Sequence, residues 1–315
     1  MKTNLIESGK RWLINSFRSP KKSIKVLITV SLLCIPIIIL GVIVYKQRDI
    51  LLTYNWQFHP LPFGLAFIFF CVSIFMSSLV WGYIVNNVSQ RISYQKHIYY
   101  YILSNLAKRM PGTIWYVASR AQMYSEEGVS ITKTSLASGL EMAFIALAGV
   151  VIALLFSTEI IVRYHLNPII FIILLIVGII LLQPKFIKWY LKLFKIDGIR
   201  IDYKLLGISL ISYAIIWILG GLLLYEIGNI VYPIPSSQLG YVIGSWTIVG
   251  VISILFIFSP TNFGITELGL SLLLTKIVPL SIAVVISVTS RILIIIFEIS
   301  LALIFLGVKR LRKGN

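Results

Sequence analysis

Long runs without a charged residue dominate this chain of 315 residues. Two of them, 26–45 and 205–225, contain 20 and 21 residues, close to the ~20 that a helix needs to cross the hydrocarbon core of a bilayer. Further apolar blocks lie at 62–85, 134–156, 168–182, 239–258 and 280–306. With 58% hydrophobic and 12% charged residues and a mean hydropathy of +0.94, the composition excludes a soluble protein. We predict an all-α polytopic membrane protein with a single membrane domain at 26–308.

Basic residues gather between the apolar blocks and indicate the topology. Of the 28 Lys and Arg, seven lie in 1–25, six in 184–204 and four in 309–315, whereas 226–238 has none. Short loops rich in Lys and Arg stay in the cytoplasm. Both termini and the 184–204 loop are therefore predicted to be cytoplasmic, in the plasma (inner) membrane of a prokaryote. The net charge of +17 is read as a topology signal rather than as a nucleic-acid surface. Segment 1–25 is predicted to be an amphipathic surface helix and 309–315 a basic tail.

Two termini on the same side require an even number of crossings. We predict six, at the apolar blocks other than 239–258, with a re-entrant hairpin at 98–125 entering from the cytoplasm and another at 239–275 entering from outside. Each half, about 26–157 and 168–308, then contains helix, helix, hairpin and helix in opposite orientation, which is an inverted repeat. The alternative is eight transmembrane helices, because 239–258 is long enough to cross.

Each predicted hairpin contains a helix-breaking motif. The first is Lys108-Arg109-Met110-Pro111-Gly112, and the second is Ser259-Pro260-Thr261-Asn262-Phe263-Gly264. Pro and Gly are tolerated at bilayer depth only where the freed backbone groups are buried in protein or line a cavity. Paired interrupted segments also point to the binding site of a transporter. We predict a polar site between the hairpins that includes Pro111, Gly112, Pro260 and Gly264.

Four charged side chains are predicted at membrane depth: Glu141, Glu267, Arg291 and Glu298. A charge at the bilayer centre costs roughly 2.5–3.5 kcal/mol, so these groups should face the bundle interior and be paired. Arg291 is expected to pair with Glu141 or Glu267 across the interface between the halves. Such a pair is a structural link, part of an ion or head-group pathway, or both.

Cationic and aromatic side chains flank the first break. Lys108 and Arg109 precede it, and Trp115 and Arg120 follow it. Helix N-termini and Lys or Arg side chains favour phosphate, so a lipid phosphate is predicted to bind here, at the cytoplasmic mouth of the cavity. The alternative is that these cations reach anionic head groups without recognising one lipid.

These motifs resemble those of a known family. Ala107-Lys108-Arg109-Met110-Pro111-Gly112-Thr113-Ile114-Trp115, followed by Arg120, Gly128-Val129-Ser130 and a helix with Glu141, resembles the flippase-like family that includes the transmembrane region of lysylphosphatidylglycerol synthases. Pro260, Gly264 and Glu267, with Arg291 and Glu298 in the last helix, resemble its second signature, although extra glycines expected near the second break are missing. The resemblance covers about 25–308. It implies translocation of a phospholipid or polyprenyl-phosphate-linked lipid between leaflets, and a fold with two re-entrant elements.

The synthases also carry a soluble aminoacyl-transferase domain, which we do not expect here because the chain ends seven residues after Val308. The predicted function is lipid translocation by a stand-alone flippase-like protein that is not an enzyme, has no cofactor, and has a membrane lipid or lipid-linked substrate as its partner. Two alternatives stay open. One is a membrane enzyme with Glu141 or Glu267 as acid or base. The other is a non-transporting assembly factor in lipid-linked glycan or phospholipid biosynthesis, acting with partner enzymes or as a homo-oligomer.

Overall fold

A computed structural model gives the architecture, and it describes residues 59–107, 115–193, 199, 201–255 and 264–314, with short pieces of 38–53. Every regular element in this part of the chain is a helix, which confirms the predicted all-α class for these residues. Segment 1–25, most of the first predicted crossing, all of the first break motif and most of the second lie outside the described residues.

Among the described residues, five helices are long and apolar enough to cross a membrane. They are α4 (Pro60–Val88), α7 (Ile131–Phe156), α11 (Tyr203–Val231), α12 (Leu239–Leu255, preceded by the 3-10 turn η1, Ser236–Gln238) and α14 (Leu280–Gly314). A sixth candidate is formed by α9 (Pro168–Leu181) and α10 (Pro184–Leu193), which meet at a bend of 60°. The chain is therefore a multi-pass membrane protein in composition and helix length, as the apolar blocks predict.

Polar caps explain where three of these helices begin. The side chain of Ser130 accepts a hydrogen bond from the Lys133 N–H at the start of α7, and Asp202 accepts one from Leu205 at the start of α11. Asn167 does the same for α9, whose first residue is a proline. These caps satisfy backbone N–H groups that have no partner within the helix. The first turns of α7, α9 and α11 are thus defined by local sequence.

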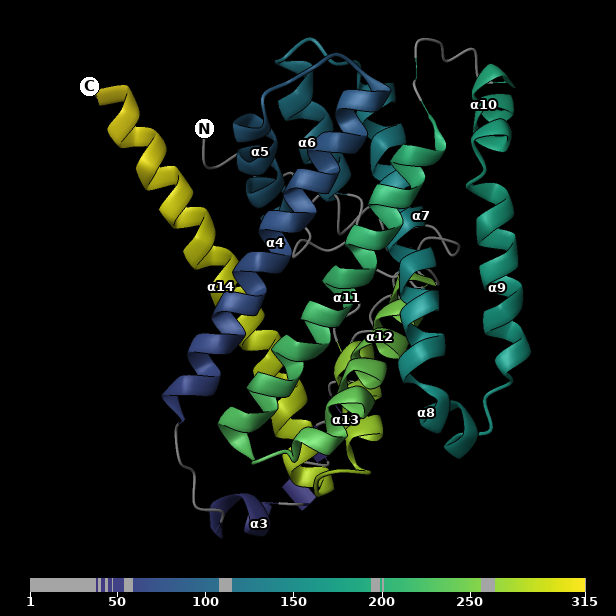
Figure 1. Ribbon diagram of the computed structural model, residues 1–315. Coiled ribbons are helices and arrows are strands. Elements are labelled where there is room, and N and C mark those ends of the chain that lie inside the picture. Colours follow the sequence, from purple (N-terminus) through teal and green to yellow (C-terminus); the bar gives the residue numbers. More distant parts are fainter. Residues whose placement is uncertain are drawn as a thin grey trace, which may run out of the picture.

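Three helices next to the break motifs are too short to cross alone. They are α5 (Tyr94–Ala107), α6 (Trp115–Ser125) and α13 (Ile265–Leu274), of 14, 11 and 10 residues. At ~1.5 Å per residue they measure about 15–21 Å, whereas the hydrocarbon core is ~30 Å thick. Helix α5 packs on α6, and α12 packs on α13. In Figure 1, α5 and α6 lie towards the end of the bundle that holds the C-terminus, and α13 lies towards the opposite end.

Helix α11 occupies the centre of the bundle. It packs against α4, α7, α12 and α14, so it joins the first and second halves of the chain. Helices α9 and α10 lie at the edge beside α7 (Figure 1). Glycines permit the closest helix contacts: a Cβ on Gly244 of α12 would lie 2.4 Å from the Phe156 carbonyl oxygen of α7. Small residues at such interfaces are typical of membrane bundles.

Side-chain contacts bring two distant turns to one end of the molecule. Lys276, in the turn between α13 and α14, forms an ion pair with Glu159 of α8 (Thr158–Arg163), and its ammonium lies 4.6 Å from the Tyr241 ring centroid. Tyr164 donates a hydrogen bond to the Leu272 carbonyl, 3.1 Å away. The predicted topology assigns both turns to the outer side, and their proximity agrees with a shared side. The orientation itself stays a prediction, as do the inverted repeat and the hairpins.

Candidate functional site

A fully buried ion pair joins α6 to α7. Arg120 is 0% exposed and Glu141 is 2% exposed, and the Arg120 Nη1 donates to Glu141 Oε2. The Arg120 Nε also donates to Ser104 Oγ of α5 at 3.0 Å, and the Tyr213 hydroxyl of α11 donates to Glu141 Oε1 at 3.3 Å. We call Arg120 with Glu141 the first charge pair. The hydrogen bonds of this pair connect four helices: α5, α6, α7 and α11.

Aromatic rings surround the guanidinium of the first charge pair. Its central carbon lies 4.3 Å from the ring centroids of Trp81 and Tyr101, and 5.1 Å from that of Tyr116. Cations over aromatic faces gain ~2 kcal/mol or more when water is excluded. These rings and the carboxylate replace the hydration that the guanidinium loses on burial. They also tie α4 to the same point.

A chain of hydrogen bonds runs from this cage to the turn between α4 and α5. Trp81 Nε1 donates to the Tyr124 hydroxyl at 2.9 Å, and that hydroxyl lies 2.5 Å from His97 Nδ1. His97 Nε2 lies 3.2 Å from Asn86 Oδ1. His97 is fully buried, and burial lowers its pKa to about 4, so its imidazole is neutral near pH 7. Gly82 makes room for the ring, because a Cβ there would lie 2.8 Å from it.

Glu127 anchors the turn between α6 and α7 onto α5. Its carboxylate accepts hydrogen bonds from Lys96 Nζ at 2.6 Å and from the Tyr100 hydroxyl at 2.7 Å, and its carbonyl accepts one from Gln90. The hydrogen bonds from Lys96 and Tyr100 hold the Glu127 pKa below its ordinary value. The short helices α5 and α6 are thus fixed at both ends, by Glu127 and by the first charge pair.

A second charge pair lies in the other half of the chain. Glu267 of α13 is 3% exposed, and its Oε1 lies 3.6 Å from Arg291 Nε of α14. Its Oε2 accepts a hydrogen bond from the Gly264 N–H at 2.6 Å, where Gly264 adopts φ of 89°. The carboxylate therefore also caps α13 directly after the second break. A residue with a Cβ would be strained at this φ.

The two pairs correct one detail of the sequence prediction. Arg291 does pair with Glu267, as predicted, but Glu141 pairs with Arg120. Each pair therefore lies within one half of the chain instead of joining the halves. The cation and the anion exchange places between the two pairs. The short helix α6 supplies the cation in the first pair, and the short helix α13 supplies the anion in the second.

The remaining predicted site residues divide into three groups. Arg120 does not line an entrance, because its side chain is completely buried. Trp115 is the first residue of α6 and is half exposed, and Glu298 is partly buried two turns after Arg291 on α14. The third group lies outside the described residues: Lys108, Arg109, Pro111, Gly112 and Pro260.

Sequence reasoning missed the polar and aromatic partners of the first charge pair. Trp81, Ser104 and Tyr213 each contact it from a different helix. The available signal was a Trp in the predicted crossing that became α4 and a Tyr in the one that became α11, since buried Tyr and Trp usually find a polar partner. Two polar atoms near this region, Arg120 Nη2 and Asn105 Oδ1, are buried without a hydrogen-bond partner in the described part of the chain. In the same part, no group of three or more His, Cys, Asp or Glu could hold a metal ion.

No family model matches the chain, and no curated protein matches it. The family resemblance of the motifs therefore stays a proposal, and the function is argued from the residues.

Proposed function

We propose that this protein is a flippase-like transporter that moves a phospholipid or a polyprenyl-phosphate-linked lipid between leaflets. One observation carries the proposal: each interrupted segment leads into a short helix whose buried charge pairs with the next long helix. Intramembrane charges that face the bundle interior mark substrate or ion pathways. A simple anchor has no need of two such pairs.

An inverted repeat is part of this proposal. Helices α4, α5, α6 and α7 have 29, 14, 11 and 26 residues, and α11, α12, α13 and α14 have 29, 17, 10 and 35. Glu141 is ten residues into α7, and Arg291 is eleven residues into α14. The length of α13, about 15 Å, favours a hairpin over an eighth crossing. Both halves then begin and end with a long helix and have two shorter helices between them, with the charge pair at matching places, and α12 is the one intervening helix that is itself a candidate span.

The proposed path uses the polar groups in order. The cations Lys108 and Arg109 attract the lipid phosphate at the cytoplasmic end, where helix N-termini add backbone N–H donors. Inside, the phosphate competes with Glu141 for Arg120, whose Nη2 has no hydrogen-bond partner among the described residues. Glu141 displaces the phosphate again, so binding stays weak enough for release. The second charge pair provides the equivalent exchange at the other end.

Reconstitution tests the proposal. Purified protein in liposomes is expected to move a fluorescent phospholipid or polyprenyl-phosphate lipid to the other leaflet, measured with a membrane-impermeant quencher, and to leave it chemically unchanged. An altered lipid product would favour the membrane enzyme instead. No movement and no product, with or without an ion gradient or membrane potential, would reject transport in favour of an assembly factor.

Two variants separate capture from translocation. Lys108→Ala with Arg109→Ala is expected to weaken lipid capture, whereas Glu141→Gln is expected to slow translocation more than capture. Lys133→Ala with Lys204→Ala is a matched control, because it removes two basic residues on the same predicted side away from the break. Normal translocation by the first double variant would remove Lys108 and Arg109 from the site and leave transport standing.

A further inference from the structure

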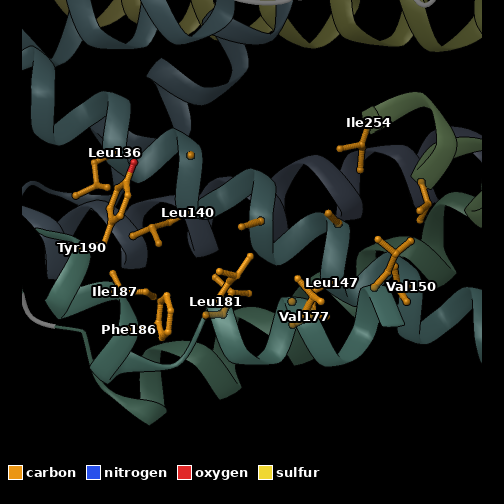
Figure 2. Close-up of a pocket in the computed structure, with 17 residues that line it drawn as sticks. Leu136, Leu140, Leu147, Val150, Val177, Leu181, Phe186, Ile187, Tyr190 and Ile254 are labelled. Carbon is orange, nitrogen blue, oxygen red and sulfur yellow. The ribbon is translucent and has the colours of Figure 1, made fainter. Parts of the chain in front are cut away.

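A cavity of about 530 Å³ lies between α7 and the bent pair α9 and α10, with α12 at one end, and none of its lining residues belongs to either charge pair. Figure 2 shows Leu136 and Tyr190 at one end of it and Val150 and Ile254 at the other. Among its 17 lining residues, the only polar side chain is that of Tyr190. We call this cavity the α7/α9 groove.

The groove has the size and shape of a hydrocarbon chain. From Leu136 to Val150, α7 advances 14 residues, or about 21 Å at the helical rise. At roughly 30 Å³ for each water-sized group, about 530 Å³ holds on the order of 18 such groups. A long, narrow space of this volume fits one acyl chain in extended form. It does not fit water, which needs two to four polar partners.

The surroundings of the groove are those of a bilayer. The outer face of α9 exposes a series of aliphatic side chains: Ile169, Ile170, Ile172, Ile173, Ile176, Ile179 and Ile180. On the inner side, Leu147 of α7 lies against Gly178, where a Cβ would meet it at 2.7 Å. The groove is therefore open to hydrocarbon rather than to water, and only an apolar occupant is compatible with its walls.

Helix α10 lines the Tyr190 end of the groove and carries three lysines on its exposed face. The bend of 60° turns α10 away from the axis of α9. Ile187 and Leu191 are buried, Phe186 and Tyr190 line the groove, and the exposed lysines of α10 form a separate face. These lysines are Lys185, Lys188 and Lys192. Trp189 is exposed, as is typical of a helix at the membrane interface.

We propose that the α7/α9 groove binds one acyl chain of an anionic phospholipid whose head group lies against the lysines of α10. The apolar walls select the chain, and the three cations select the negative head group over a zwitterionic one. The site does not depend on the proposed transport, because no residue of either charge pair lines it. A lipid held there fills the gap between α7 and α9.

Photolabelling tests the position of the chain. Phosphatidylglycerol with a diazirine near the end of one acyl chain is supplied in vesicles with the intact protein, irradiated, and mapped by mass spectrometry of peptides. We expect labels on the lining residues of α7 and α9. Gly139→Leu should reduce this labelling several-fold, because Gly139 lines the groove and a Cβ there meets nothing within 4 Å.

Gly207→Leu is the matched control for Gly139→Leu. It makes the same change within a helix, at a position that also has nothing within 4 Å and does not line the groove. Its labelling should equal that of the parent. Ala143→Leu fills the groove at a second position in case Gly139→Leu does not fold. Labels spread evenly over the exposed helix faces, or labelling unaffected by either filling variant, would overturn the site.

A second experiment tests the predicted selectivity for an anionic head group. Phosphatidylcholine with the same diazirine chain should label the groove several-fold less than phosphatidylglycerol. Neutralising the three lysines with Lys185→Gln, Lys188→Gln and Lys192→Gln should lower phosphatidylglycerol labelling to the phosphatidylcholine level. Equal labelling by both lipids in the parent protein would overturn the anionic selectivity. Lipid translocation is not read out here, so failure of transport and failure of the groove are distinguishable.

Discussion

At the scale of single residues, the first charge pair is the most demanding feature of this protein. Arg120→Ala leaves the Glu141 carboxylate buried without the cation that it pairs with, while the hydrogen bond from Tyr213 remains. Removing one partner of a buried pair typically costs ~3–5 kcal/mol. Thermal unfolding in detergent should therefore show a large loss of stability, and replacing both partners by Met and Leu should recover much of it.

Arg291→Ala is the internal comparison for Arg120→Ala. Arg291 is partly exposed and lies 3.6 Å from Glu267, which retains the hydrogen bond from the Gly264 N–H. Its loss leaves a carboxylate that is still partly satisfied. The unfolding midpoint should fall less than in Arg120→Ala. The reverse order would contradict the assignment of the first pair as the stronger link.

His97 predicts a pH dependence of stability. It lies in α5, which is not among the candidate spans, and burial lowers its pKa from 6.5 to about 4. The unfolded chain binds the proton more readily, so this stabilisation is complete above pH 6.5 and is lost as pH falls towards 4. The loss is on the order of 3 kcal/mol. His97→Gln should flatten the decline of the unfolding midpoint across this window, and an unchanged decline would show that other groups cause it.

It was easier to predict from sequence which charged residues are buried than to predict which residues they pair with. The buried charges Glu141 and Glu267 and the need for an acidic partner of Arg291 follow from sequence, because an unpaired charge at bilayer depth is costly. The sequence did not decide between Glu141 and Glu267 as that partner. The partner of Glu141 did not follow, since Arg120 stands just after a break and was placed at a surface. Spacing along the chain does not determine which helices meet. The aromatic cage around Arg120 is likewise a property of packing.

At the scale of elements, glycine sets the distance between α7 and α12. A Cβ on Gly244 would lie 2.4 Å from the carbonyl oxygen of Phe156, which is backbone and cannot rotate away. Gly244→Ala should therefore separate the helices and cost ~1–3 kcal/mol, as overpacking does. Gly64→Ala in α4 is the control, because nothing lies within 4 Å of its Cβ position. Equal unfolding midpoints for the two variants would contradict the close contact.

Helix boundaries were predictable wherever local chemistry sets them. The apolar blocks 62–85, 134–156, 205–225 and 280–306 each lie inside one helix, and Pro or a polar cap marks several starts. The block 168–182 was predicted as a crossing, yet α9 has only 14 residues and reaches spanning length only together with α10. The block has 15 residues, fewer than the ~20 of a full crossing, and Pro184 follows it, so its length was a signal that the prediction of a simple crossing did not use.

At the scale of the whole molecule, the contacts divide the protein into two ends. Helix α8 and the turn between α13 and α14 lie at one end, where Glu159 and Lys276 form an ion pair, and α10 lies at the other end (Figure 1). The density of basic residues predicts that the second end is cytoplasmic. The packing of side chains does not determine which end faces the cytoplasm, because turning the bundle over changes no contact within the protein. Orientation must therefore be measured in the membrane.

Cysteine labelling supplies that measurement. In a background with Cys34→Ala and Cys71→Ala, Ser236→Cys should react with an impermeant maleimide added to intact cells, because 226–238 has no basic residue and Ser236 is exposed. Lys192→Cys on α10 should react only after the membrane is opened. Lys276→Cys should label from the same side as Ser236→Cys, because in the parent protein Lys276 lies beside Glu159, in a turn that the predicted topology also assigns to the outer side. Labelling of Ser236→Cys from the cytoplasm alone would invert the topology. A Lys276→Cys that labels from the cytoplasm alone would remove the outer hairpin, and with it the repeat on which the proposed exchange of charge pairs depends.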